Sequence, residues 1–286
     1  MLKSQTKNYL LKHCHNLSGK TVVVTGANSG IGLCATEELI FLGAKVIMAC
    51  RSLAKAQAAK EALQRDYPDA DIEIRQLDLA CKASIRQFAD GIIADSIDID
   101  AFVNNAGVFN ISGKTADGED IVMGTNFSGT ALLADALLPY LETLPHKVKM
   151  TFTTSISYVL GDTLQAEDYS AMGGLRLYAT SKLRLTRYAL TLSKALSSCG
   201  SNVEVTLTHP GIAITPLASK AFGKRFMKIA MPLGKLLIQP TEKSALAIPL
   251  VIANGNVAGC IYGPDGFLCG WGYPKKNRIH RKALCK

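Results

Sequence analysis

The 286-residue chain has no internal repeat, no low-complexity run and no linker rich in Pro, Gly or Ser, so we expect a single domain. It has no apolar run approaching the roughly 20 residues that a membrane-spanning helix needs. The N-terminus is polar and basic, without the apolar core of a secretory signal. We therefore expect a soluble, cytoplasmic protein with an N-terminal extension (residues 1–18), one domain (19–263) and a basic C-terminal tail (264–286).

Recognition patterns for metals and nucleic acids are also missing. The eight cysteines are scattered, without a Cys-x-x-Cys pair or a His at zinc-ligand spacing, so we expect free thiols and no metal site. The formal net charge is +9, but Lys and Arg are spread along the chain and no nucleic-acid recognition motif occurs. This charge predicts a basic surface suited to anionic ligands, and no nucleic-acid partner. The basic cluster at residues 275–282 is typical of a mobile tail.

A glycine turn near the N-terminus follows a β-branched run, residues 20–25, and precedes a helical pattern, residues 33–42. A strand, a glycine turn and a helix form the phosphate-binding arrangement of a doubly wound α/β fold. Glycines let the backbone approach a pyrophosphate, which rests at the positive end of the helix. We expect dinucleotide contacts from the turn residues Gly26, Asn28, Ser29, Gly30, Ile31 and Gly32.

The second predicted strand, residues 45–49, lacks an acid at its end and continues into Arg51 and Ser52. An NAD site usually has Asp or Glu there to accept a hydrogen bond from the ribose 2′-hydroxyl. A guanidinium instead suits a 2′-phosphate, through bidentate charge-assisted hydrogen bonds. The sequence therefore favours NADP(H) over NAD(H). The alternative is that Arg51 faces solvent.

A Tyr and a Lys share one face of the helix predicted over residues 177–196. Tyr178 and Lys182 are four residues apart, so their side chains are neighbours. A nearby cation favours the ionised phenol, which predicts a lowered Tyr178 pKa and an acid or base near neutral pH. No Gly-x-Ser-x-Gly elbow occurs, so we do not expect a serine nucleophile.

Together these motifs resemble the short-chain dehydrogenase/reductase family. The matching residues are TGxxxGxG at 25–32, NNAG at 104–107, Tyr-x-x-x-Lys at 178–182 and Pro-Gly at 210–211. The ACRS at 49–52 and the long gap between Ser155 and Tyr178 resemble the retinol-dehydrogenase-like and WW-domain-oxidoreductase-like branch. The resemblance implies a single-domain α/β fold, a doubly wound Rossmann-type parallel sheet of about seven strands with helices on both faces.

The resemblance also implies roles for single residues. Asn126, on a helix predicted over 119–144, would order a water that links Lys182 to solvent, and Lys182 would bind the nicotinamide ribose. Ser155, or alternatively Ser157, would hold the substrate carbonyl. Asp78 would contact the adenine, or cap the helix predicted over 82–94. The remaining cofactor contacts would come from Ser52, Leu79, Asn105, Ala106, Gly107, Pro210, Gly211, Ile212 and Thr215.

The implied reaction is hydride transfer between NADP(H) and a carbonyl or secondary alcohol, with Tyr178 as acid and base. Residues 216–239 carry an apolar stripe flanked by lysines, which predicts a lid (213–239) over a lipophilic substrate, or else a helix lying on a membrane surface. A catalytically silent NADP-binding sensor is the alternative function, followed by a membrane- or nucleic-acid-associated scaffold. Many family members form homodimers through the helices that carry the equivalents of Asn126 and Tyr178.

Overall fold

The computed structural model describes residues 2–163, 169, 172–211, 239–254, 259–266, 270, 272–277, 279 and 283. Its strands are β1 Thr21–Thr25, β2 Lys45–Cys50, β3 Ile72–Gln76, β4 Ala101–Asn104, β5 Val148–Thr153, β6 Val203–Thr208, β7 Ile261–Pro264 and β8 Pro274–Asn277. They form one sheet in the order β3-β2-β1-β4-β5-β6-β7-β8. All neighbouring pairs are parallel except β7 and β8, so the doubly wound α/β fold is confirmed.

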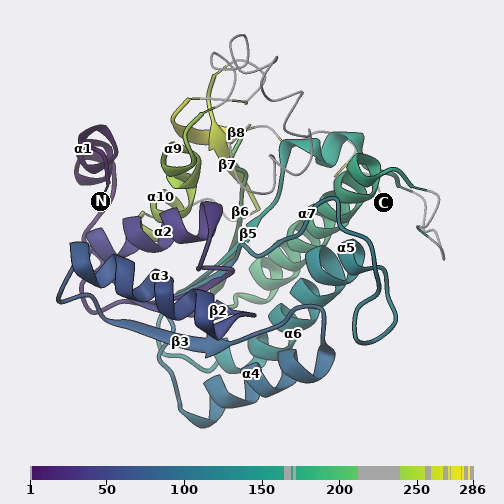
Figure 1. Ribbon diagram of the computed structural model, residues 1–286, viewed down its shortest axis with the longest axis horizontal. Coiled ribbons are helices and arrows are strands. Elements are labelled where there is room, and N and C mark those ends of the chain that lie inside the picture. Colours follow the sequence, from purple (N-terminus) through teal and green to yellow (C-terminus); the bar gives the residue numbers. More distant parts are fainter. Residues whose placement is uncertain are drawn as a thin grey trace.

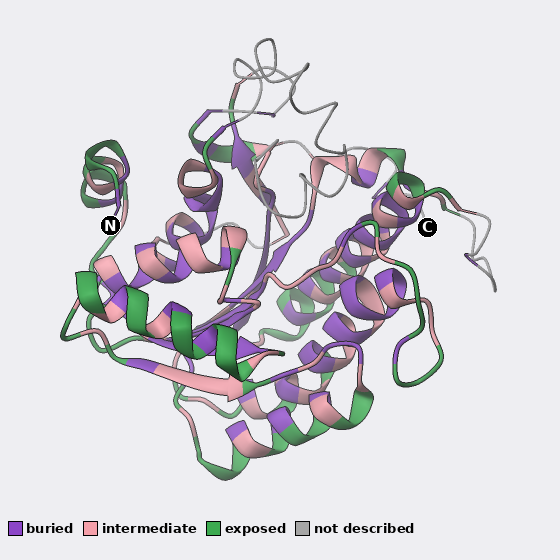
Figure 2. Ribbon diagram, in the orientation of Figure 1, coloured by how far each residue is buried: buried purple, intermediate pink, exposed green. Residues whose placement is uncertain are grey.

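Helices cover both faces of the sheet (Figure 1). They are α1 Ser4–His13, α2 Gly30–Phe41, α3 Leu53–Asp66, α4 Lys82–Ala94, α5 Ile121–Met123, η1 Gly124–Ser128, α6 Gly129–Leu141, η2 Ile156–Leu160, α7 Gly174–Cys199, α9 Thr241–Ala245 and α10 Ala247–Ala253. Successive strand residues point to opposite faces. Val22 and Val24 therefore pack into the core beneath α2, while Val23 packs into the core beneath α4 and α6. Most residues of the central strands are buried, as expected for a covered parallel sheet (Figure 2).

The eighth strand corrects the sequence prediction of about seven strands. β8 pairs antiparallel with β7, with Ile261 opposite Asn277. Part of the predicted tail, residues 264–286, is therefore the edge of the sheet. Lys275 and Lys276 are exposed on β8. Lysines are common on edge strands because they discourage pairing with another chain. The tail was predicted from this cluster of basic residues, which instead belongs in part to an edge strand.

The predicted N-terminal extension packs against the domain through α1. Leu10 of this helix is completely buried. Lys3 forms an ion pair with Glu242 of α9 at 3.3 Å. The Asn254 side chain donates to the carbonyl of His13 at 2.6 Å. Residues before the glycine turn thus contribute to the core beneath α2 and α9.

The helix predicted over 119–144 is interrupted. Asp120 starts it by accepting hydrogen bonds from Val122 N and Met123 N, and the wider π-helical turn η1 then carries Asn126. Such turns are frequent at functional sites. Within the described residues, the stretch Ile121–Leu141 is the one helix that could cross a membrane by length and composition, and 56% of its most apolar window is buried. It packs against α4 and α7 as a core helix of the sheet.

One buried carboxyl group predicts how stability depends on pH. Glu38 of α2 is fully buried, and neither of its carboxylate oxygens has a hydrogen-bond partner among the described residues. Burial, and then the charges of Glu37 and Glu242, raise the pKa of Glu38 well above its ordinary value. The folded protein therefore keeps a proton that the unfolded chain has lost, and stability falls as pH rises above the unfolded-state pKa.

We expect Glu38→Gln to remove this loss. The variant should gain up to about 1.4 kcal/mol in free energy of unfolding for each pH unit over that range. Urea unfolding at about pH 5 and about pH 8 measures the difference. Glu61→Gln, on the exposed face of α3, is the matched control and should leave the pH dependence unchanged. Parallel pH dependences of wild type and Glu38→Gln would contradict the prediction.

Candidate active site

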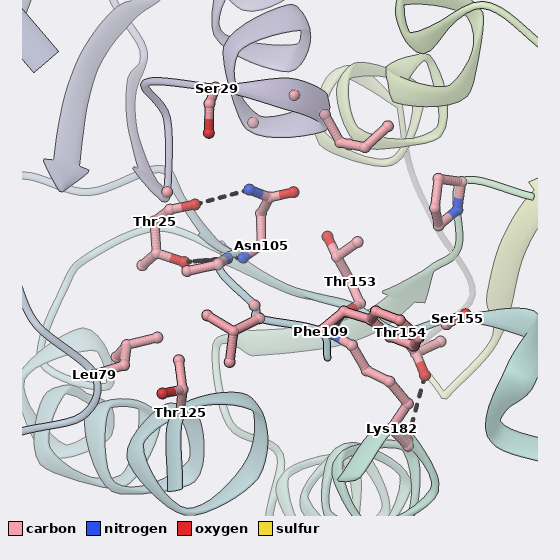
Figure 3. Close-up of a pocket in the computed structure, with 18 of the residues that line it drawn as sticks. Thr25, Ser29, Leu79, Asn105, Phe109, Thr125, Thr153, Thr154, Ser155 and Lys182 are labelled. Carbon is pink, nitrogen blue, oxygen red and sulfur yellow. Dashed lines mark hydrogen bonds between the residues drawn. The ribbon is translucent and has the colours of Figure 1, made fainter. Parts of the chain in front are cut away.

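A cavity of about 560 Å³ opens at the carboxyl ends of the parallel strands (Figure 3). It lies where the strand order reverses between β1 and β4, the usual ligand position in doubly wound sheets. Sixteen predicted site residues line it, namely the acid Tyr178 and residues predicted to bind the cofactor: Gly26, Asn28, Ser29, Gly30, Ile31, Gly32, Arg51, Asp78, Leu79, Asn105, Ala106, Gly107, Tyr178, Lys182, Pro210 and Gly211. Ile212, Thr215 and the predicted lid up to residue 238 lie outside the described residues.

The glycine turn between β1 and α2 is packed so closely that larger residues do not fit. A Cβ atom on Gly32 would lie 2.3 Å from the carbonyl oxygen of Gly26 and 2.5 Å from Asn105 Nδ2. Gly26 has a φ of +67°, and a Cβ there would lie 3.0 Å from the Cα of Ala106. The glycines thus bring the turn directly against the segment that follows β4.

Thr25 joins the two strand ends that form this part of the cavity. Its hydroxyl accepts from Asn105 N at 2.9 Å and Ala106 N at 3.0 Å, and donates to Val103 O at 3.3 Å. The Asn105 amide in turn donates to the carbonyl of Thr25 at 2.9 Å (Figure 3). The predicted NNAG segment is therefore fixed to the glycine turn.

The N-terminus of α2 lies at the cavity, where its residues Gly30, Ile31 and Gly32 are part of the lining. Ser29 is the N-cap residue, but its side chain makes no capping hydrogen bond, and the first turn contains no acidic residue. The first amides of a helix lack partners within the helix and carry partial positive charge. This end of the cavity therefore fits a phosphate group.

Arg51 lines the cavity at the end of β2 with an exposed side chain. Ser52 does not line it: this residue is the N-cap of α3, where its hydroxyl accepts from Lys55 N at 3.4 Å. Asp78 does line the cavity and accepts from Ala80 N at 2.9 Å. The alternative that Asp78 caps the next helix is wrong, because Cys81 is the N-cap of α4.

Helix α7 places Tyr178 and Lys182 side by side in the cavity, with Lys182 only 3% exposed. Lys182 Nζ donates to the carbonyl of Thr153 at 2.8 Å and lies 5.9 Å from the centre of the Tyr178 ring. Burial lowers the pKa of Lys182 to about 8. The structure therefore places an amine that still carries its charge at neutral pH beside the phenol.

The Tyr178 pKa moves opposite to the sequence expectation. Burial raises the pKa of Tyr178 to about 12, partly offset by a hydrogen bond with Ser155. The expected lowering by Lys182 was wrong because the phenolate would lose its hydration, and desolvation exceeds the other effects. Tyr178 is thus a protonated phenol at neutral pH.

Ser155 and Ser157 both line the cavity, but they occupy different positions relative to the phenol. Ser155, the N-cap of η2, is hydrogen-bonded to Tyr178. Ser157 donates its hydroxyl to Ser155 Oγ at 2.9 Å, and its backbone amide points to the same atom at 3.3 Å. Ser155 is therefore the serine beside Tyr178, and Ser157 orients it.

Asn126 is completely buried and does not line the cavity. Its Oδ1 accepts from Val108 N at 2.7 Å, and its Nδ2 donates to Val108 O at 2.8 Å and Ser181 Oγ at 3.1 Å. Asn126 thus clamps the segment after β4 against α7. A Cβ on Gly107 would lie 3.2 Å from Asn126 Oδ1 and 3.5 Å from Lys182 Nζ, so Lys182 lies next to this clamp. The role of Asn126 in a water relay stays a prediction.

An apolar group of residues lies next to Tyr178 and was not predicted from the sequence. The Phe109 ring meets the Tyr178 ring edge-on, with ring centres 4.9 Å apart. The position of Phe109 directly after the NNAG segment was the available signal. Val108 and Ile111 belong to the same apolar cluster as Tyr178, and Ile156 and Leu175 also line the cavity. Thr25, Leu77, Thr125, Thr153 and Thr154 also line the cavity without having been predicted.

Comparison with known proteins defines the class. The family model for short chain dehydrogenases matches residues 20–225, and the chain belongs to this family. Within the family it belongs to the retinol-dehydrogenase-like branch. It is 36% identical over 212 residues to retinol dehydrogenase 12 of Bos taurus, covering 72% of this chain and 65% of that protein.

Two further proteins extend the comparison. The chain is 35% identical over 240 residues to retinol dehydrogenase 13 of Homo sapiens, covering 80% of this chain and 70% of the relative. The chain spans 63% to 65% of the length of the first three curated relatives. A solved structure of an uncharacterized protein from Mycobacterium paratuberculosis has a TM-score of 0.76 at 27% identity, covering 96% of this chain and 90% of the other.

Proposed function

We propose that the protein is an NADP(H)-dependent oxidoreductase that interconverts the carbonyl and alcohol forms of a lipophilic small molecule. The observation that carries this proposal is the position of Tyr178, hydrogen-bonded to Ser155 and beside the Lys182 amine. These residues lie in a cavity with a phosphate-compatible end at α2 and an apolar side at Phe109. The names of the retinol dehydrogenase relatives agree with an apolar substrate that carries a hydroxyl or aldehyde group.

The residues present fit NADP(H). The glycine turn and the α2 amides would hold the pyrophosphate, Arg51 the 2′-phosphate, Lys182 the nicotinamide ribose, and the turn at Pro210 and Gly211 the nicotinamide. When bound, the cofactor supplies or accepts the hydride.

The side chains then have separate tasks in carbonyl reduction. Tyr178 holds a proton at neutral pH and would donate it to the carbonyl oxygen. Ser155 would hold the same oxygen by a hydrogen bond. The Lys182 ammonium would stabilise the phenolate that remains, which offsets the effect of burial during the reaction. The apolar residues beside Tyr178 would exclude water and select lipophilic substrates.

NADPH oxidation over a panel of lipophilic ketones, aldehydes and quinones tests the proposal, with NADH measured in parallel. Turnover of at least one compound with NADPH is the expected result. Binding of NADPH without turnover of any compound would favour the catalytically silent sensor. Absence of NADPH binding would overturn both functions.

The position of Arg51 leads to a separate prediction about the preference for NADPH over NADH. We expect Arg51→Asp to raise the KM for NADPH by about 10- to 100-fold, because the 2′-phosphate loses a charge-assisted partner and meets a carboxylate. The KM for NADH should stay the same or fall. Arg65→Asp, exposed near the end of α3, makes the same charge change away from the cavity and should have no effect. An unaltered KM for NADPH in Arg51→Asp would show that Arg51 does not bind the 2′-phosphate.

A further inference from the structure

The turn at Pro210 and Gly211 has to be held in place by its surroundings. It directly follows β6 and lines the cavity. Gly211 has a φ of +68°, and a Cβ there would lie 2.4 Å from the carbonyl oxygen of Gly270. The backbone of this turn is therefore packed against the segment that leads into β8.

One buried amide connects this turn to the C-terminal segment. Gln239 is 3% exposed and lies 29 residues after Pro210 in the sequence. Its Nε2 donates to the carbonyl of Pro210 at 2.9 Å, and its Oε1 accepts from Gly272 N at 3.0 Å. Both ends of the amide are used, so the side chain works as a bridge between two backbone segments.

A second connection acts on the same turn from the other side. His209 Nδ1 accepts from Gly211 N at 3.3 Å, and His209 Nε2 lies 2.9 Å from Asn277 Nδ2 of β8. The ring packs closely against Gly263 of β7, where a Cβ would lie only 2.1 Å from Nε2. Burial lowers the pKa of His209 to about 4, so this ring is neutral at ordinary pH and acts in structure rather than in proton transfer.

Through these contacts, residues that lie outside the family match support the turn that lines the cavity. Gln239, Gly272 and Asn277 all follow residue 225, where the match to the family model ends. Gln239 is the one whose side chain bonds the turn directly and the C-terminal segment at the same time. Loss of this bridge would release the carbonyl of Pro210 and the amide of Gly272 together.

We propose that Gln239 is a positioning residue for the nicotinamide end of the cavity, holding the Pro210–Gly211 turn against the C-terminal β7–β8 hairpin. The inference rests on the proposed function, because that turn would contact the nicotinamide. A displacement of about 1 Å at a reacting centre lowers a rate by about 100-fold. Among the described residues, the hydrogen bonds of the Gln239 side chain go to Pro210 and Gly272, so the adenine end near Arg51 and Asp78 should be unaffected.

The test uses the full chain with Gln239→Met, which has a similar size and lacks both hydrogen bonds. We expect kcat to fall by about 10- to 100-fold and NADPH to bind more weakly. The affinity for 2′,5′-ADP, which occupies only the adenine end, should stay within about twofold of wild type. Because His209 is neutral, the loss of kcat should be constant between about pH 6 and pH 9.

Two more variants make the result specific. Gln239→Leu also lacks both the donor to Pro210 O and the acceptor for Gly272 N, so it should lose kcat as Gln239→Met does. It also carries the test if the Met variant fails to fold. Gln57→Met, on the exposed face of α3, is the control and should match wild type.

Several outcomes would overturn the inference. Wild-type kcat and NADPH affinity in Gln239→Met, or in Gln239→Leu, would show that the bridge does not position the turn. Equal weakening of NADPH and 2′,5′-ADP binding would show a general structural role. A wild-type protein without NADPH turnover would instead remove the proposed function on which the inference rests.

Discussion

Tyr178→Phe should lower kcat by about 10²- to 10⁴-fold while NADPH binding changes by less than about twofold. The substitution removes one oxygen atom and leaves the ring, which packs edge-on against Phe109. Because Tyr178 would transfer its proton only during the reaction, the loss should appear in kcat. Ser155 would also lose its hydrogen-bond partner, but it would remain next to the substrate oxygen.

Tyr188→Phe is a matched control on the same helix. Its hydroxyl donates to Asp135 at 2.5 Å and does not line the cavity. We expect this variant to lose about 1 kcal/mol of stability from that hydrogen bond and to keep its activity. Steady-state kinetics and thermal unfolding of both variants measure the contrast. Full activity of Tyr178→Phe would contradict the assignment of the acid.

The direction of the reaction determines how pH acts on Tyr178. The raised pKa keeps the phenol protonated, so carbonyl reduction has its proton donor at neutral pH. Alcohol oxidation needs the phenolate, and its rate should rise with pH between about 7 and 10. Above the lowered pKa of Lys182, about 8, the amine loses its charge and supports the phenolate less. The increase should therefore be less steep at the upper end of this range.

Gly32→Ala should weaken NADPH binding by about 100-fold. The added Cβ would lie 2.3 Å from the carbonyl oxygen of Gly26 and 2.5 Å from Asn105 Nδ2. Because the first atom belongs to the backbone, the movement of a side chain alone cannot relieve the clash. The turn would have to separate from the segment after β4, which would shift the α2 amides away from the pyrophosphate. Overpacking of this kind also costs about 1 to 3 kcal/mol in stability.

Gly91→Ala is the control for Gly32→Ala, because it makes the same substitution at a position where the added Cβ has an ordinary contact. Gly91 lies within α4, and a Cβ there would meet Arg75 Nη1 at an ordinary 3.7 Å. Alanine in a helix interior is favoured over glycine by about 0.5 to 1 kcal/mol, so this variant should be slightly more stable with unchanged binding. Isothermal titration with NADPH and thermal unfolding test both variants. Wild-type NADPH affinity in Gly32→Ala would show that the close packing of the turn does not determine binding.

The sequence alone determined features that depend on neighbours along the chain. The β-branched run before Gly26 predicted a buried strand, and the pattern after Gly32 predicted a helix, because side-chain periods follow directly from local geometry. Four-residue spacing placed Tyr178 and Lys182 on one face of α7. The parallel sheet followed from strands and helices that alternate, since parallel strands need such crossovers.

Features that depend on residues far apart in the sequence are set by tertiary contacts. Ser155 rather than Ser157 lies beside Tyr178 because η2 turns back toward α7. The pKa of Tyr178 rises rather than falls because other segments, including that of Phe109, exclude water from it. The pairing of β8 with β7 and the hydrogen bond from Gln239 to Pro210 both join residues that are distant in the sequence. The exclusion of water from one side chain and long-range hydrogen bonds depend on residues that are distant in the sequence, so no local pattern could report them.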